Sequence, residues 1–125
     1  MSVVIIHEGT KSAPRILYDP EVNTLFITGR SITESPESVY LPLEEWIRAH
    51  FKKFKQLSIV IFLDYINSGS SKSLRDILRL IGSYMPPEYM VKVKWKYEED
   101  DESMHELGEH YRDSAGVRME MEMVI

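Results

Sequence analysis

The run LSIVIFLDYINSGSSKSL, residues 57–74, gives the clearest indication of how this chain folds. Its first ten residues are almost continuously apolar and rich in β-branched side chains, which is typical of a strand buried on both faces of a sheet. Four serines, one glycine and one lysine follow within seven residues, which is typical of a loop. Apolar residues then recur at helical spacing, at Leu74, Ile77, Leu78 and Ile81. The stretch therefore predicts a buried strand, a serine-rich loop and an amphipathic helix.

The residues after this stretch continue the alternation of helices and strands. The run GSYMPPEY (82–89) is expected to end the helix, because it holds a glycine and two adjacent prolines. MVKVKWKY (90–97) alternates apolar and lysine side chains, which predicts a strand with one solvated face. A third helix is expected from about Glu102 to Asp113, and VRMEMEMV (117–124) alternates again. Two further strands are therefore predicted, with the third helix between them.

The residues before the central stretch predict strands and one more helix. Residues 2–7 are expected to form a short strand, and PRILYDPEVNTLFITGRS (14–31) predicts a hairpin with a tight turn. The polar stretch 29–39 is expected to be a loop. LPLEEWIRAHFKKFK (41–55) has apolar residues at helical spacing, and Pro42 suits a first helical position.

The order of these elements is strand, hairpin, helix, strand, helix, strand, helix, strand. This order predicts a single α/β domain spanning residues 1–125, with a mixed sheet of about five to six strands. Three helices are expected, mostly on one face of the sheet. A chain of 125 residues with 43% hydrophobic residues is long enough to bury one core.

Composition excludes several classes of function. The formal charge is −5, which argues against nucleic acid as a partner, because phosphate contacts need a basic face. The chain has no cysteine, so disulfides, zinc ribbons and thiol nucleophiles are excluded. Its longest apolar run is far shorter than the roughly 20 residues that span a bilayer. We therefore expect a soluble, cytoplasmic protein that binds neither membrane nor nucleic acid.

The serine-rich segment is compatible with several kinds of site. A phosphate-binding loop needs G-x-x-x-x-G-K-[ST], and the segment has a single glycine. A serine nucleophile on a sharp elbow needs G-x-S-x-G, which is absent. Helix capping by Ser70 or Ser71 explains one hydroxyl. A phosphoacceptor hydroxyl just before a helix would lie in a positive field, close in sequence to Lys72.

A second cluster is KWKYEEDDESMHELGEHY (94–111), which holds five consecutive acids, Glu98 to Glu102. A zincin motif needs histidines four residues apart, but His105 and His110 are five apart and do not share a helix face. Four interpretations stay open from the residues alone. Two concern function through chemistry or a small ligand: a carboxylate-bound magnesium site in a small metal-dependent hydrolase, and an anion-binding module that uses the serine segment. The other two are an acidic surface that binds a protein partner and a solvated charge run that favours the start of the helix through its dipole.

Four separate blocks carry a resemblance to a known family. They are SAPRILYDPEVNTLFITGRS (12–31), VYLPLEEWI (39–47), DYINSGSSKSL (64–74) and VKWKYEEDDESMHELGE (93–109). Together they resemble the SiaC family of bacterial regulatory phosphoproteins. The resemblance implies a STAS-like fold, similar to anti-sigma-factor antagonists, and a switch protein with no catalytic site, cofactor or metal. It also implies three partners: a GGDEF diguanylate cyclase, a serine/threonine kinase and a PP2C-type phosphatase.

The resemblance also implies where the switch lies. The family loop reads Asn-Thr-Ser-Ser-Ser-Lys, so its acceptor threonine corresponds to Ser68, with Ser70 as the second choice. The unphosphorylated form is expected to bind and activate the cyclase, which favours biofilm, and phosphorylation is expected to release it. Alternatives are a sigma-factor regulator or a kinase as the target, or the hydrolase. The expected partner surface consists of Asn67, Gly69, Ser70, Ser71, Lys72, Glu99, Asp100, Asp101 and Glu102.

Overall fold

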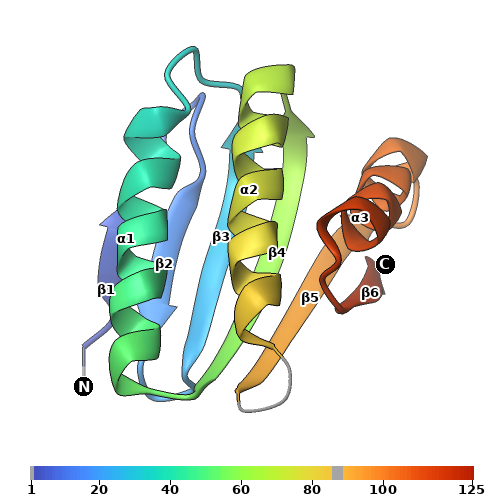
Figure 1. The fold of residues 1–125 in the computed structure, drawn as a ribbon. Coiled ribbons are helices and arrows are strands. Elements are labelled where there is room, and N and C mark those ends of the chain that lie inside the picture. Colours follow the sequence, from blue (N-terminus) through green and yellow to red (C-terminus); the bar gives the residue numbers. More distant parts are fainter. Residues whose placement is uncertain (1, 86–88) are drawn as a thin grey trace.

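The computed structural model describes residues 2–85 and 89–125 of the chain (Figure 1). Within these residues the chain forms six strands and three helices, in the predicted order. The elements are β1 (Val4–His7), β2 (Arg15–Asp19), β3 (Thr24–Ser31), α1 (Glu37–Lys53), β4 (Gln56–Ile66), α2 (Ser68–Tyr84), β5 (Met90–Glu98), α3 (Glu102–Ala115) and β6 (Met119–Val124).

The strands form one sheet in which neighbours in space are also neighbours in sequence, in the order β1-β2-β3-β4-β5-β6. The pairs β1/β2 and β2/β3 are antiparallel, whereas β3 to β6 run parallel, with one helix between each consecutive pair. Each crossover advances one strand in the same direction, so right-handed connections place all the helices on one face (Figure 1). The predicted mixed sheet is confirmed, and the likeness to anti-sigma-factor antagonists stays a prediction.

The core lies between the helices and one face of the sheet. In β4, the side chains of Leu57, Ile59, Ile61 and Leu63 are buried, but the alternating residues between them are only half-buried. The prediction that this strand is buried on both faces was therefore wrong. All three described helices cover the same face, so apolar residues such as Phe62 lie on a face that no described helix covers.

Two helices begin earlier than predicted. Helix α1 starts at Glu37, so the loop before it is much shorter than 29–39, and Pro42 lies inside the helix rather than at its first position. Helix α2 starts at Ser68, so the serine segment is helical rather than a loop. This helix ends at Tyr84, within the run predicted to end it, and residues 86–88 of that run lie outside the described residues.

Candidate functional site

The junction between β4 and α2 is organised by Asn67. The side-chain oxygen Oδ1 accepts a hydrogen bond from the Ser70 amide at 2.9 Å, so Asn67 is the N-cap of α2. Its amide nitrogen Nδ2 donates to the Thr33 carbonyl at 3.1 Å, and its backbone N–H donates to the Ser31 carbonyl at 3.0 Å. The prediction that Ser70 or Ser71 caps this helix was wrong, because the residue before the serines does so.

Because Asn67 caps the helix, Ser68 becomes its first residue. Ser68 and Gly69 are exposed in the first turn, and Lys72 is exposed one turn further along the face of Ser68. The first turn contains no acidic residue, so no carboxylate of the helix offsets the positive end of its dipole. Ser70, in contrast, is fully buried in this conformation, and its hydroxyl has no hydrogen-bond partner among the described residues.

Removing the cap should loosen the start of α2. Asn67→Ala should lower the free energy of unfolding by about 1–2 kcal/mol, because the Ser70 amide and the Thr33 carbonyl both lose a partner. Asn67→Ser is the matched control, since serine also caps helices but cannot bond to Thr33. Urea denaturation should show that the free energy of unfolding of Asn67→Ser is about 1 kcal/mol higher than that of Asn67→Ala. Equal losses would contradict the capping role.

The start of α2 is tied to α3 by Tyr111. The Tyr111 hydroxyl lies 2.5 Å from Ser71 Oγ and also donates a hydrogen bond to the Ser71 carbonyl at 3.1 Å. The ring is buried, and burial raises the pKa of the Tyr111 phenol, although the hydrogen bond to Ser71 and the charge of Arg75 act in the opposite direction. Ser71 is therefore engaged in packing the two helices together.

A second buried tyrosine, Tyr40 on α1, should make stability depend on alkaline pH. Its hydroxyl bonds to Ser31 Oγ at 2.6 Å, and burial raises the pKa of Tyr40 to about 12. A tyrosine in the unfolded chain ionises at a pKa of about 10. Because the folded chain holds the proton to higher pH, this stabilisation is complete below about pH 10 and is lost as the pH rises toward 12.

Tyr40→Phe should therefore flatten the alkaline loss of stability. Between about pH 10 and 12, the wild type should lose up to about 1.4 kcal/mol per pH unit more than this variant. The comparison needs denaturant unfolding at several pH values. Tyr65→Phe is the matched control, because Tyr65 is 59% exposed and should leave the slope unchanged. If stability fell with pH at the same rate in the wild type and in Tyr40→Phe, Tyr40 would ionise as readily in the folded protein as in the unfolded chain.

The acidic segment forms the connection from β5 to α3. Asp101 caps α3, since its Oδ1 accepts a hydrogen bond from the Met104 amide at 3.1 Å. Glu99, Asp100 and Glu102 are exposed, and Glu102 is the first residue of the helix. Acids at this position also favour the helix through its dipole. Asp101 thus has a structural role, while its three neighbours point their charge at solvent.

The structure places both predicted segments at the same edge of the sheet, where the parallel strands end (Figure 1). A groove of about 770 Å³ runs between the end of β4 and the start of α3. Its lining includes Arg30, Asp64, Tyr65, Ile66, Glu98, Asp100 and Asp101. The groove reaches Ile66, which lies two residues before Ser68, but none of residues 67–72 lines it. The two segments are therefore neighbours along one edge.

The groove carries a net acidic charge. Among the described residues that line it, the only basic one is Arg30, which lies 3.7 Å from Asp64 and over the ring of the exposed Tyr65. No further described cation of the lining accompanies its other acids. Aromatic and apolar residues line the same groove, among them Tyr65, Ile66 and Leu107. A basic segment with an apolar face would match this lining in both charge and polarity.

The histidines of the second cluster are engaged in side-chain packing. His105 stacks on Tyr97, with ring centroids 4.5 Å apart, and lies 3.8 Å from Glu109. His110 packs beside Tyr111, with ring centroids 6.3 Å apart. Among residues 2–85 and 89–125, no group of three or more His, Asp or Glu side chains is arranged to hold a metal ion. The same residues contain no helix that is long and apolar enough to cross a membrane.

The roles of several residues at this edge were not predicted from sequence. Asn67 was expected at the partner surface but not as the helix cap, although asparagine is among the preferred N-caps and the cap could have been predicted. Tyr111, Arg30 and Asp64 carry no local signal, because their roles depend on strands and helices distant in sequence meeting at the edge. A single sequence shows no such meeting of distant residues.

Comparison with known proteins agrees with this architecture. The sequence-family model of the SiaC family of regulatory phosphoproteins matches residues 7–124 of this chain. An uncharacterized protein of Pseudomonas aeruginosa (strain UCBPP-PA14) is 27% identical over 108 residues, which cover 86% of each chain.

Solved structures show the same fold. Apo-SiaC from Pseudomonas aeruginosa superposes with a TM-score of 0.84 and 25% identity, covering 98% of this chain and 99% of that one. The crystal structure of diguanylate cyclase SiaD in complex with its activator SiaC, from the same organism, contains a chain that superposes with a TM-score of 0.87 and 24% identity. The match covers 97% of this chain and 99% of that one. The family match spans nearly the whole chain, and this protein therefore belongs to the SiaC family of regulatory phosphoproteins.

Proposed function

We propose that this chain is a non-enzymatic switch protein whose unphosphorylated form binds and activates a GGDEF diguanylate cyclase. The observation that carries the proposal is the exposed hydroxyl of Ser68, at the first residue of a 17-residue helix and at the same edge as the acidic groove. The cyclase is proposed as the partner because the similar SiaC of Pseudomonas aeruginosa is the activator of the diguanylate cyclase SiaD.

Ser68 is the proposed phosphoacceptor. The amino end of a helix carries a positive potential equivalent to about half a unit charge, which favours an anion. No acid in the first turn of α2 competes for that potential, and Lys72 lies one turn along the same face. A phosphoryl group on Ser68 would add about −1.5 to −2 charge at neutral pH, and these groups would stabilise it. Ser70 would become accessible only if the first turn opened, because it is fully buried.

Release on phosphorylation follows from how a partner would pack at this edge. Gly69 has no side chain and Ser68 has a small one, so a partner can approach the backbone of the first turn closely. A basic segment lying in the acidic groove would bring the partner to that turn. A phosphoryl group on Ser68 would occupy space that the partner fills in the proposed complex. It would also lose its hydration water, and no cation of the partner would be positioned to replace that water. Both effects would weaken binding.

Two enzymes would set the state of the switch. We propose a serine/threonine kinase that adds the phosphoryl group and a PP2C-type phosphatase that removes it. Through the cyclase, the unphosphorylated form would raise cyclic di-GMP and favour biofilm. The exposure of Ser68 is what both enzymes need, because each must bring the hydroxyl or its phosphate into an active site.

A pull-down from lysate of the native host tests this proposal. Three baits are compared by mass spectrometry: Ser68→Ala, Ser68→Asp and Ser83→Asp. Ser83 is exposed near the other end of α2, so its variant controls for an added charge on the same helix. The Ser68→Ala and Ser83→Asp baits should capture a GGDEF protein and the Ser68→Asp bait should not. Equal capture by all three, or capture of a sigma-factor regulator in place of the cyclase, would contradict the proposal.

A further inference from the structure

The sheet has an unprotected margin at β1. This strand pairs with β2 on one side, and no strand among the described residues pairs with its other side. Figure 1 shows β1 at the margin of the sheet, far from β6. Half of the backbone N–H and C=O groups of an edge strand point outward and can template pairing with another chain. The outer edge of β1 is therefore free to accept a further strand.

The side chains of this edge are apolar on both faces. Val3, Val4 and Ile5 are 47%, 44% and 38% exposed, which is high for residues of their type. Residues 2–6 read SVVII and contain neither a charge nor a proline. Proteins usually place lysine, glutamate or proline on exposed edges to prevent pairing. Residues 2–6 carry none of these side chains, although β1 is short and its pairing with β2 shifts register between Ile5 and His7.

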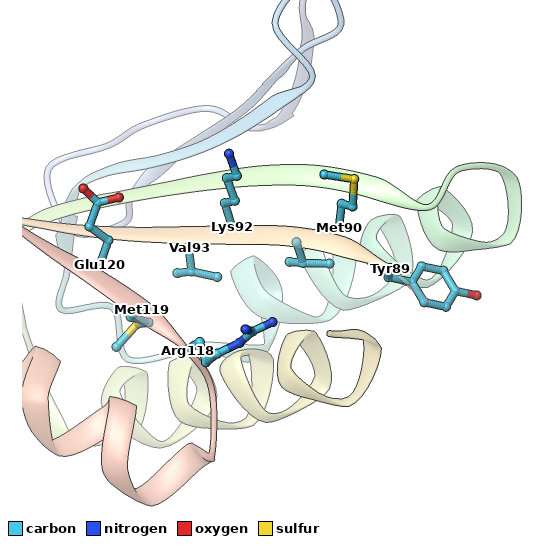
Figure 2. A pocket seen from close by; sticks show the side chains of 8 residues that line it. Tyr89, Met90, Lys92, Val93, Arg118, Met119 and Glu120 are labelled. Carbon is cyan, nitrogen blue, oxygen red and sulfur yellow. The ribbon is translucent and has the colours of Figure 1, made fainter. Parts of the chain in front are cut away.

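The opposite margin of the same sheet is protected. Along β6, Glu120 and Glu122 alternate with methionines, and Glu122 contacts Lys94 at 3.4 Å and Lys96 at 3.5 Å. The first residues of β5 extend beyond β6, since their pairing begins at Val93 with Met119. Figure 2 shows that charged side chains surround this stretch as well: Lys92, Arg118 and Glu120. Within residues 2–85 and 89–125, the edge strand that lacks Lys, Arg, Asp and Glu side chains is therefore β1.

An apolar row leads across the helix-free face to this edge. Ile5 is paired with Leu17, Leu17 with Phe26, and Phe26 with Val60, so four side chains on four strands lie side by side. All but Ile5 are half-buried. If the β1 strands of two copies paired antiparallel about an axis at Ile5, the two rows would join into one of twice the length. That joining would give Ile5 a neighbour on both sides, like the half-buried members of the row.

The charges beside the edge fit the same arrangement. Antiparallel pairing brings the Glu8 end of one β1 to the Ser2 end of the other. Ser2 lines a hollow of about 770 Å³ with Lys53, Phe54 and Lys55, and none of the described residues that line this hollow is acidic. Glu8 is exposed, so its carboxylate would approach two lysines of the other copy. Symmetry repeats this contact at both ends of the interface.

We propose that β1 is the interface of a symmetric dimer, in which two copies pair their β1 strands antiparallel and extend one sheet across both. Backbone pairing supplies the contact, the joined apolar row covers part of Ile5, and Glu8 meets Lys53 and Lys55 of the second copy. The proposal is independent of Ser68, which lies on α2 at the carboxyl edge of the sheet.

Sedimentation equilibrium from about 1 µM to about 1 mM protein tests the dimer. The wild type should shift from monomer to dimer across this range. Ile5→Lys should stay monomeric, because two lysines would face each other at the axis. Met123→Lys is the matched control, a similarly exposed apolar residue on the opposite edge strand, and should dimerise like the wild type. Circular dichroism confirms that each variant is folded. A wild type monomeric at about 1 mM, or dimerisation of Ile5→Lys, would overturn the proposal.

A charge exchange tests the antiparallel orientation. Glu8→Lys should weaken the dimer about two- to tenfold, and so should Lys53→Glu combined with Lys55→Glu, because each places like charges together. Combining all three substitutions should restore most of the wild-type affinity. Failure to restore it would overturn the antiparallel geometry. If the wild type is monomeric and Ile5→Lys instead loses capture of a GGDEF protein, the edge belongs to that protein and the dimer proposal is wrong.

Discussion

Phosphoserine at position 68 should weaken binding to the GGDEF cyclase by about 100-fold or more, which corresponds to about 3 kcal/mol. The physical reason is that, in the proposed complex, the partner would pack against Ser68 and Gly69, and a dianion there would have to lose its water. Isothermal titration calorimetry with protein carrying genetically encoded phosphoserine would measure the change. Phosphoserine at Ser83, which is exposed near the other end of α2, is the control and should change affinity less than about threefold.

Two further variants sharpen this result. Ser68→Ala should bind like the unphosphorylated wild type, since a methyl group replaces a small exposed hydroxyl. Incubation with the kinase should no longer release it. If phosphoserine at positions 68 and 83 had the same effect on affinity, a general gain of negative charge would explain the result, and the specific role of Ser68 would be wrong.

Trp95→Ala should lower the free energy of unfolding by about 3–5 kcal/mol, the largest expected effect of a single substitution on stability. The indole is fully buried, its Nε1–H donates to the Met104 carbonyl at 3.0 Å, and its ring meets Tyr111 edge-on. Gly108 leaves room for it, because a Cβ there would lie 2.5 Å from the indole. The substitution would open a cavity and leave a buried carbonyl unpaired.

Urea denaturation of Trp95→Ala and Trp46→Ala would measure the difference. Trp46 is half-buried and packs against Tyr18 and His50 at the surface of α1. Trp46→Ala should lower the free energy of unfolding clearly less, because a half-buried side chain contributes less buried apolar area. The hydrogen bond from Trp95 to the Met104 carbonyl also stays in place in this variant. A comparable loss from both variants would show that Trp95 does not anchor α3 to β5 as its contacts indicate.

The order of strands and helices was predictable because each element has a clear periodicity. The strict alternation in 90–97 and the helical spacing of Leu74, Ile77 and Ile81 depend only on which side chains face the core. The position of the serine segment at a strand end was predictable for the same reason. These features are local, and local patterns survive in a single sequence.

The starts of the helices were not predicted well because the signals compete. In α1, Pro42 suggested a first helical position, but the helix begins five residues earlier, which packs Val39 and Tyr40 into the core. This burial outweighs the hydrogen bond that proline cannot donate. In α2, the serines suggested a cap, but Asn67 precedes them and takes that role. Tertiary burial decided the start of α1, and a capping residue that precedes the serines decided the start of α2.

The two sides of β4 could not be distinguished from the sequence. An apolar run such as 57–66 is expected where helices cover both faces, but here the second face carries a half-buried row that ends at the exposed Ile5. Whether that face is covered depends on the direction of the crossovers, which is a property of the whole sheet. The Tyr111 bridge to Ser71 depends in the same way on where α3 returns.

We propose that the phosphorylation state of Ser68 controls a diguanylate cyclase, and a synthesis assay tests this most directly. The GGDEF protein captured by the Ser68→Ala bait is mixed with purified chain, either unmodified or carrying phosphoserine 68, and the cyclic di-GMP formed from GTP is quantified. Unmodified chain should raise the rate of synthesis, and phosphorylated chain should leave it at the level of the cyclase alone. Equal stimulation by both forms, or stimulation by neither, would contradict it.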